Sequence, residues 1–163
     1  MSGGDGIRPA HRGQRDLAGP YFERAVALNP GDVQIAYLRA WWLARTGRAE
    51  EALKYLDLAM RRDPFPPAWF WEMRGIALFA MRRYDDVIQA LARMIHRHAW
   101  DHAYVAACHA YMNRPAKARA AGAEVLRADP DFTISRYRLV EEYTLPGDLE
   151  HLLDGMRKAG LPE

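Results

Sequence analysis

The chain has 163 residues, enough for one domain with a hydrophobic core or for a short array of repeats. Half of the residues are hydrophobic and 27% are charged, as in ordinary globular proteins, and a formal net charge of +2 indicates neither a nucleic-acid partner nor an anionic membrane. A single cysteine excludes an internal disulfide and favours a reducing, cytoplasmic location. Arg or Glu interrupts every apolar stretch, and the N-terminus lacks the apolar core of a secretory signal.

The N-terminal residues 1–15 are rich in glycine, arginine and polar groups and lack hydrophobic periodicity, which predicts a disordered arm. A helix follows within DLAGPYFERAVALNP (16–30). Because proline is tolerated in the first turn of a helix, we expect this one to begin at Pro20 and end at Leu28. No complete helix precedes it, so its apolar side chains are expected to lack the usual partner helix.

Pairs of amphipathic stretches then follow one another along the chain, with apolar or small residues every three to four positions. The first stretches are residues 33–47, 68–82 and 99–113, and the second stretches are residues 48–64, 83–98 and 114–130. Equivalent positions of the second stretches and of the N-terminal helix are Ala18, Ala52, Val87 and Ala118, at spacings of 34, 35 and 31. The first stretches carry the small residues Ala40, Gly75 and Ala106, where two helices can approach closely. A repeated helix–turn–helix unit is therefore predicted.

The C-terminal region 131–163 is predicted to hold two capping helices, within residues 132–143 and 148–160. We expect the first of them to pack on the last repeat. Asp148 is the predicted N-cap of the second, and Gly160 is its predicted C-terminal stop. The expected fold class is all-α, a solenoid of antiparallel helix pairs with one partial and three full repeats over residues 16–130.

The repeat resembles the tetratricopeptide repeat (TPR). The third unit carries Trp71, Gly75, Leu78, Tyr84, Val87 and Leu91, and the second carries Ala40, Leu43, Gly47, Ala52, Leu56, Ala59 and Pro64. Arg39 and Arg74 stand where the family has leucine, which indicates imperfect helix interfaces there. The segments 63–71 (DPFPPAWFW) and 148–163 are also similar to the TPR tails of bacterial class III adenylate cyclases and related regulators, although no cyclase domain is present.

This resemblance implies a non-catalytic scaffold that binds a protein or peptide in a groove lined by the first helix of each pair. The groove positions are Gln34, Tyr37, Trp41, Ala44, Trp69, Glu72, Ile76, Phe79, Trp100, Ala103, Ala107 and Ala110. Exposed aromatic residues often mark partner sites. The predicted partner-binding residues are accordingly Tyr37, Trp41, Trp69, Glu72, Phe79 and Trp100. An aromatic stripe at helical spacing is also typical of a core, and that alternative stays open.

Two other functions remain open at this point. A self-associating regulatory arm, the role suggested by the cyclase tails, would form a homodimer through the uncapped N-terminal edge of the array. A metal-responsive module would use the histidines of HRHAWDHAYVAACH (96–109). His102 and His109 lie about 10 Å apart along a helix, too far to share one ion, and only His98 with His102 could do so.

An enzyme is not expected, and neither is a cofactor. The chain has no phosphate-binding glycine loop, no CxxC and no HExxH motif. Cys108 and His109 diverge by about 100° on a helix and cannot form a nucleophile–base pair. The spacing of only 31 residues between Val87 and Ala118 and the missing proline near residues 92–98 predict a tighter turn at this junction than at the others.

Overall fold

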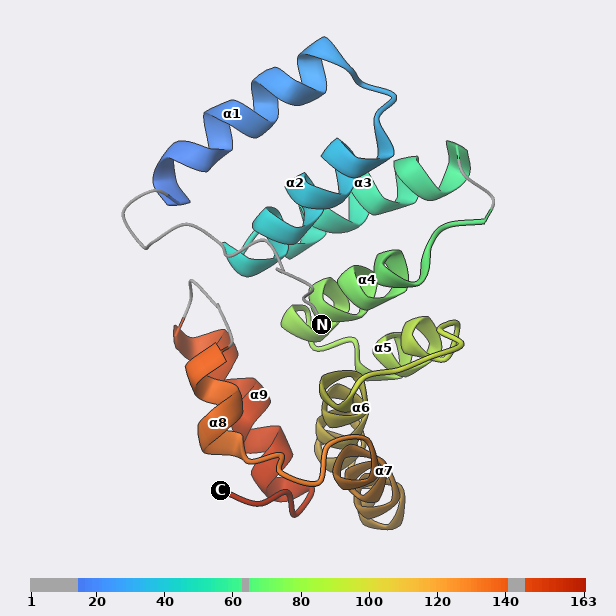
Figure 1. Ribbon diagram of the computed structural model, residues 1–163, viewed down its shortest axis with the longest axis vertical. Helices are drawn as coiled ribbons and strands as arrows, with labels where there is room; N and C mark the ends of the chain where they lie inside the picture. Colours follow the sequence, from blue (N-terminus) through green and yellow to red (C-terminus); the bar gives the residue numbers. More distant parts are fainter. Residues whose placement is uncertain (1–14, 63–64, 141–145) are drawn as a thin grey trace, which may run out of the picture.

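A computed structural model describes residues 15–62, 65–140 and 146–163, with side chains for 19–61, 65–140 and 147–163. These residues form nine α-helices and no strands (Figure 1). The helices are α1 (Arg15–Leu28), α2 (Val33–Arg45), α3 (Ala49–Arg62), α4 (Ala68–Ala80), α5 (Tyr84–Leu91), α6 (Ala99–Tyr111), α7 (Pro115–Ala128), α8 (Ile134–Val140) and α9 (Pro146–Lys158). The all-α fold class is confirmed. Apart from Arg15, the predicted disordered arm lies outside the described residues.

Helix α1 is longer than expected, because it is helical from Arg15 and contains Pro20. The expected start at Pro20 is therefore wrong. Pro20 is the sixth residue of α1 and has no N–H, so the helix lacks the bond that position 20 would otherwise make to the carbonyl of Asp16. Helix α1 packs on α2, and a Cβ at Gly19 would lie 3.0 Å from Cη2 of Trp42. Phe22 also faces Trp42, with ring centroids 6.1 Å apart, so α1 packs on the first helix of the next pair. The expected absence of a preceding partner helix concerns residues outside those described.

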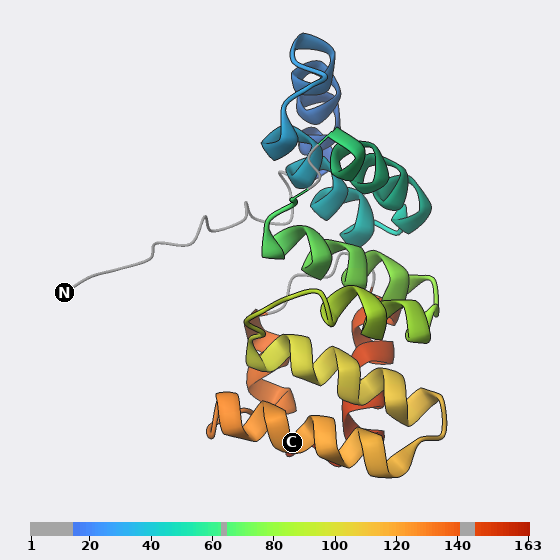
Figure 2. The same cartoon turned by 90° about the vertical axis from the view of Figure 1, so that its right-hand side faces the viewer.

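Helices α2 and α3, α4 and α5, and α6 and α7 form three antiparallel pairs stacked along the molecule (Figure 2). The small residues do lie at close approaches, since Ala40 and Ala106 are buried and a Cβ at Gly75 would meet the Leu91 side chain at 3.0 Å. Larger buried side chains fill the space between the helices, among them Leu43, Leu56, Phe70, Leu78, Val87, Leu91 and Val125.

The turn inside each pair has the same backbone geometry. Gly47, Arg82 and Asn113 adopt φ values of 82°, 62° and 53°. The next residue is always an arginine, whose N–H donates to a carbonyl five positions earlier. These bonds are Arg48 to Leu43 (2.8 Å), Arg83 to Leu78 (3.0 Å) and Arg114 to His109 (2.9 Å). A left-handed residue followed by such a bond is a Schellman-type helix end. The three units therefore share a turn as well as a hydrophobic pattern.

The two arginines that replace leucine connect neighbouring helices. The Arg39 guanidinium lies 4.4 Å from the ring centroid of Tyr55 on α3 and 3.8 Å from a carboxylate oxygen of Glu23 on α1. Arg74 on α4 forms an ion pair with Asp57 on α3. Polar and cation–π contacts thus stand at two interfaces where the resemblance to the TPR predicts an aliphatic side chain.

The α5–α6 junction differs from the prediction. Helix α5 has only 8 residues, whereas α3 and α7 have 14 each. Residues 92–98 form an irregular connection, so the short spacing arises from a shortened helix and not from a tighter turn. The Asp101 carboxylate accepts the backbone N–H of His98 at 2.7 Å and holds the start of α6. Burial raises the pKa of Asp101.

The C-terminal helices pack in an order that differs from the expected one. Helix α9 lies against α6, and α8 packs mainly against α9 (Figures 1 and 2). Asp148 is not an N-cap, because α9 begins at Pro146; its carboxylate lies 3.5 Å from the Arg82 guanidinium. Gly160, with φ of 87°, follows the end of α9 as predicted. Within the described residues, no helix is both long and apolar enough to cross a membrane.

Candidate functional site

The face of the array that the sequence marks as a groove is formed by one side of α2, α4 and α6, and we call it the groove face. Tyr37 on α2 and Trp69 on α4 meet there, with ring centroids 4.0 Å apart. Trp69 in turn stacks on Phe70 at 4.4 Å. Phe70 is fully buried, whereas Tyr37 and Trp69 are half-buried. The structure therefore anchors these two rings in the core and leaves part of each accessible.

Charged groups of both signs lie beside these rings. The Arg45 guanidinium lies 4.8 Å from the ring centroid of Trp41, which is half-buried. Burial raises the pKa of Tyr37, with a further increase from the negative charge of Glu72 and an opposing effect of Arg45. Tyr37, Trp41, Trp69 and Glu72 thus form one amphipathic area, which we call the α2–α4 surface. Aromatic area beside charges of both signs can bind a partner and also orient it.

The second half of the groove face is covered by α9. A Cβ at Gly155 of α9 would lie 2.7 Å from the Ala107 Cβ on α6, so the two backbones are in close contact. Phe79, an expected groove residue, is only 1% exposed and touches the rings of Tyr104 and His151. Ala103 and Ala107 are likewise fully buried. The expectation that Phe79 lines an open surface is therefore wrong, because α9 covers it.

Trp100 stands apart from the other predicted residues. It lies in the first turn of α6, is 42% exposed, and stacks on His98 with ring centroids 4.3 Å apart. Among the described residues, Trp100 makes its ring contact with this histidine and not with the aromatic rings of α2 and α4. The six predicted residues therefore divide into four on the α2–α4 surface, one in the core and one at the edge of the array.

A polar and aromatic cluster fixes α9 in place. The Tyr84 hydroxyl lies 2.8 Å from Nε2 of His151. The Tyr111 hydroxyl lies 2.6 Å from the His151 carbonyl oxygen and 2.8 Å from an Asp154 carboxylate oxygen, so both are within reach of its single proton. The Tyr111 and His151 rings stack 4.2 Å apart, and Lys158 Nζ lies 2.6 Å from the same carboxylate. Sequence reasoning missed this cluster, because its members are 40 and 67 positions apart and share no periodic pattern.

We expect His151 to make the stability of the protein sensitive to pH. Burial, and after it the charge of Arg82, lower the pKa of His151 below its usual range. A histidine whose pKa is lower in the folded state contributes stability above the unfolded value of about 6.5, and this contribution is lost as the pH falls below it. The His102 and His109 pKa values are lowered too. We expect the free energy of unfolding to fall less in the His151→Gln variant than in the wild type when the pH is lowered from about 7 to about 5. Urea unfolding at the two pH values measures this difference. Equal losses would contradict this role of His151.

The histidines of the 96–109 stretch lie in two different environments. His96 and His98 are exposed in the α5–α6 connection, while His102 and His109 are half-buried along α6. Within the described part of the chain, no three His, Cys, Asp or Glu side chains come together as ligands for an ion. Cys108 is fully buried, and burial raises the pKa of its thiol, which makes it a poor nucleophile.

Comparison with known families agrees with the helical repeat. Residues 10–70 match the family model of the tetratricopeptide repeat. The matched segment spans α1 to α3, the start of α4 and most of the α2–α4 surface, although it covers less than half of the chain. No curated protein matches the sequence. The TPR family generally mediates protein–protein interactions and is typically non-catalytic, and nothing found here links the chain to adenylate cyclase tails.

Proposed function

We propose that this protein is a non-catalytic scaffold that binds a protein or peptide on the α2–α4 surface. The observation that carries the proposal is the cluster of half-buried rings of Tyr37, Trp41 and Trp69 beside Glu72. Tryptophan and tyrosine are frequent binding hot spots, and rings already anchored in the core lose little conformational freedom when a partner binds. The TPR match over the same helices supports this reading.

We assign binding to the α2–α4 surface because α9 covers the other half of the groove face and is costly to displace. Leu152, Leu153 and Met156 of α9 are fully buried. Exposing three such side chains costs roughly 5–9 kcal/mol, which is comparable to the whole stability of a typical domain, about 5–15 kcal/mol. A partner that had to remove α9 would need to offset this cost before it gained any affinity.

The test is affinity capture with the full chain, followed by identification of the captured proteins and titration with each purified candidate. We expect Trp41→Ala together with Trp69→Ala to weaken binding by roughly 30-fold or more, because truncating a hot spot costs about 2 kcal/mol or more.

Trp71→Ala is the matched control, since Trp71 is also half-buried on α4 but lies beside Arg93, with the guanidinium 5.7 Å from its ring centroid. Circular dichroism would verify that all variants remain folded. A partner that binds the double variant and the wild type equally would overturn the proposal.

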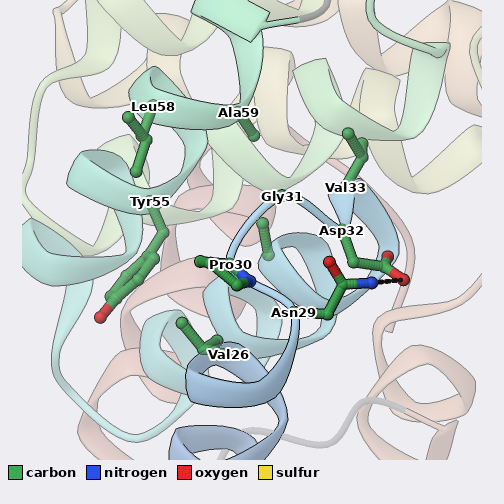
Figure 3. A pocket seen from close by; sticks show the side chains of 10 residues that line it. Val26, Asn29, Pro30, Gly31, Asp32, Val33, Tyr55, Leu58 and Ala59 are labelled. Atoms are coloured by element: carbon green, nitrogen blue, oxygen red, sulfur yellow. Dashed lines mark hydrogen bonds between the residues drawn. The ribbon is translucent and has the colours of Figure 1, made fainter.

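Self-association is a second candidate, favoured by the outer surface of α1. Tyr21 and Leu28 are 75% and 77% exposed and lie seven positions apart, on one face of the helix. A small cleft also lies beside α1, lined in part by Val26, Tyr55 and Leu58 (Figure 3). A homodimer would cover it. A strict monomer in light scattering at high protein concentration would exclude this candidate.

A further inference from the structure

A polar hollow lies between α4 and α5, the two helices of the central pair, and encloses about 180 Å³. Three arginines line it: Arg74 on α4, Arg83 directly before α5, and Arg93 in the connection after it. The lining also includes Gln89 of α5. A guanidinium group carries five N–H donors and no acceptor. The hollow therefore offers mainly donors and positive charge, which suits an anion.

Two of the three arginines are already paired with acids. Arg74 forms an ion pair with Asp57 on α3, and Arg83 forms one with Asp86, whose Oδ2 lies 2.7 Å from Nε of Arg83. The bond from Arg74 comes from Nη1, while Arg83 uses Nε and Nη2. Each guanidinium therefore keeps N–H groups that bond no acid among the described residues, and the two carboxylates hold both groups in position.

The third arginine supplies the excess of positive charge. Arg93 is exposed, and within the described part of the chain its guanidinium pairs with no acid. Its contact is the ring of Trp71, whose centroid lies 5.7 Å from the guanidinium carbon. Three arginines thus stand against two aspartates, Asp57 and Asp86, which leaves one positive charge in excess at the hollow.

The fold of the repeat does not require this charge. In the preceding pair, 35 positions earlier, the counterpart of Arg93 is Leu58, which lines the small apolar cleft of Figure 3. In the following pair, 31 positions later, the counterpart is Glu124. One position of the repeat thus carries leucine, arginine and glutamate in turn, so packing of the helix pair does not explain the arginine.

We propose that this hollow binds a phosphate group through Arg74, Arg83, Arg93 and Gln89. A phosphate group presents at least three acceptor oxygens, so it can accept hydrogen bonds from arginines that approach from three different segments, whereas a carboxylate has only two oxygens in one plane. The fork of an arginine also matches two phosphate oxygens at once. The Trp71 ring lies beside Arg93 and is not among the groups that bind the ligand. The proposal does not depend on partner binding at the α2–α4 surface.

The test is titration of the full chain with sodium phosphate at constant ionic strength, followed by amide NMR spectra. We expect saturable shifts of the amides of residues 83–93, which sodium chloride at the same ionic strength does not produce. Arg93→Gln should weaken phosphate binding by roughly tenfold or more, because it removes a charged donor. The matched control is Arg24→Gln, since Arg24 is exposed and occupies the same repeat position on α1 but lies outside the hollow. It should leave binding unchanged.

A second titration, with the tripeptide Gly–phosphoserine–Gly, distinguishes two sources of the phosphate group. Tighter binding of the tripeptide than of inorganic phosphate would identify a phosphorylated polypeptide as the ligand, and weaker or equal binding would identify a small free phosphate compound. The tripeptide with unmodified serine should not bind.

Three results would overturn the proposal: no saturable shift with inorganic phosphate or the phosphorylated tripeptide, equally tight binding of sodium acetate, or equal affinity of the wild type and Arg93→Gln for phosphate. Arg93 and Arg24 are exposed, so their replacement should not unfold the protein, and thermal unfolding would verify that.

Discussion

Replacing Phe79 by alanine is expected to lower the free energy of unfolding by about 3–5 kcal/mol, the usual cost of truncating a buried phenylalanine. The ring is 1% exposed and lies where α4, α5, α6 and α9 meet. Its removal would leave a cavity against Tyr84, Tyr104 and His151, which other side chains in a close-packed core cannot readily fill. Urea unfolding followed by circular dichroism measures the effect.

Phe65→Ala is the matched control, because it makes the same chemical change at a side chain that is 89% exposed. We expect it to change stability by less than about 0.5 kcal/mol. Similar effects of the two substitutions would contradict the burial of Phe79, and with it the position of α9 on the groove face.

Gly155→Ala is expected to destabilise the protein by about 1–3 kcal/mol through overpacking. The added Cβ would lie 2.7 Å from the Ala107 Cβ and 2.8 Å from Cε2 of Tyr111, and the Ala107 backbone is only 3.2 Å away. Alanine is a better helix former than glycine by about 1 kcal/mol, so helix propensity alone predicts the opposite sign. The clash should dominate because one of its partners is backbone. Thermal or urea unfolding decides the sign.

Gly147→Ala provides the comparison within the same helix. A Cβ at Gly147 would meet nothing within 4 Å, so this change should be neutral or slightly stabilising. If Gly155→Ala also stabilised the protein, α9 could not be in close contact with α6.

The helical repeat could be read from the sequence because local patterns determine it. Apolar residues at helical spacing predicted the helix pairs, and the small residues Ala40, Gly75 and Ala106 marked real close contacts. Gly160 predicted the end of α9, because glycine is common just after the last turn of a helix. Each of these features depends on neighbours within a turn or two of helix, or on a pattern that recurs in every repeat.

The features that the sequence could not reveal depend on long-range packing. Trp69 and Phe79 occupy the same stripe of α4, yet one is half-buried and the other is buried beneath α9. No spacing within α4 distinguishes them, because the difference comes from residues about 70 positions later. The helix start before Pro20 was missed for another reason, since the rule that proline begins a helix is only a preference.

These observations give the two halves of the groove face different roles. The α6 half has small residues at Ala103 and Ala107, and these allow α9 to approach closely and complete the core. The α2 half has large rings at Tyr37 and Trp41, which remain partly accessible. A C-terminal helix that packs on the groove face, instead of continuing the stack, therefore limits the area on which the proposed partner can bind.

Amide hydrogen–deuterium exchange of the full chain tests the central claim most directly, namely that α9 is a stable part of the groove face. If α9 is docked as described, its amides from Leu149 to Lys158 should exchange about as slowly as those of α6, because both helices open only with the shared core. Rapid exchange throughout α9, with α6 still protected, would contradict the account, because α9 would then leave the face in solution and expose Phe79 and Ala107.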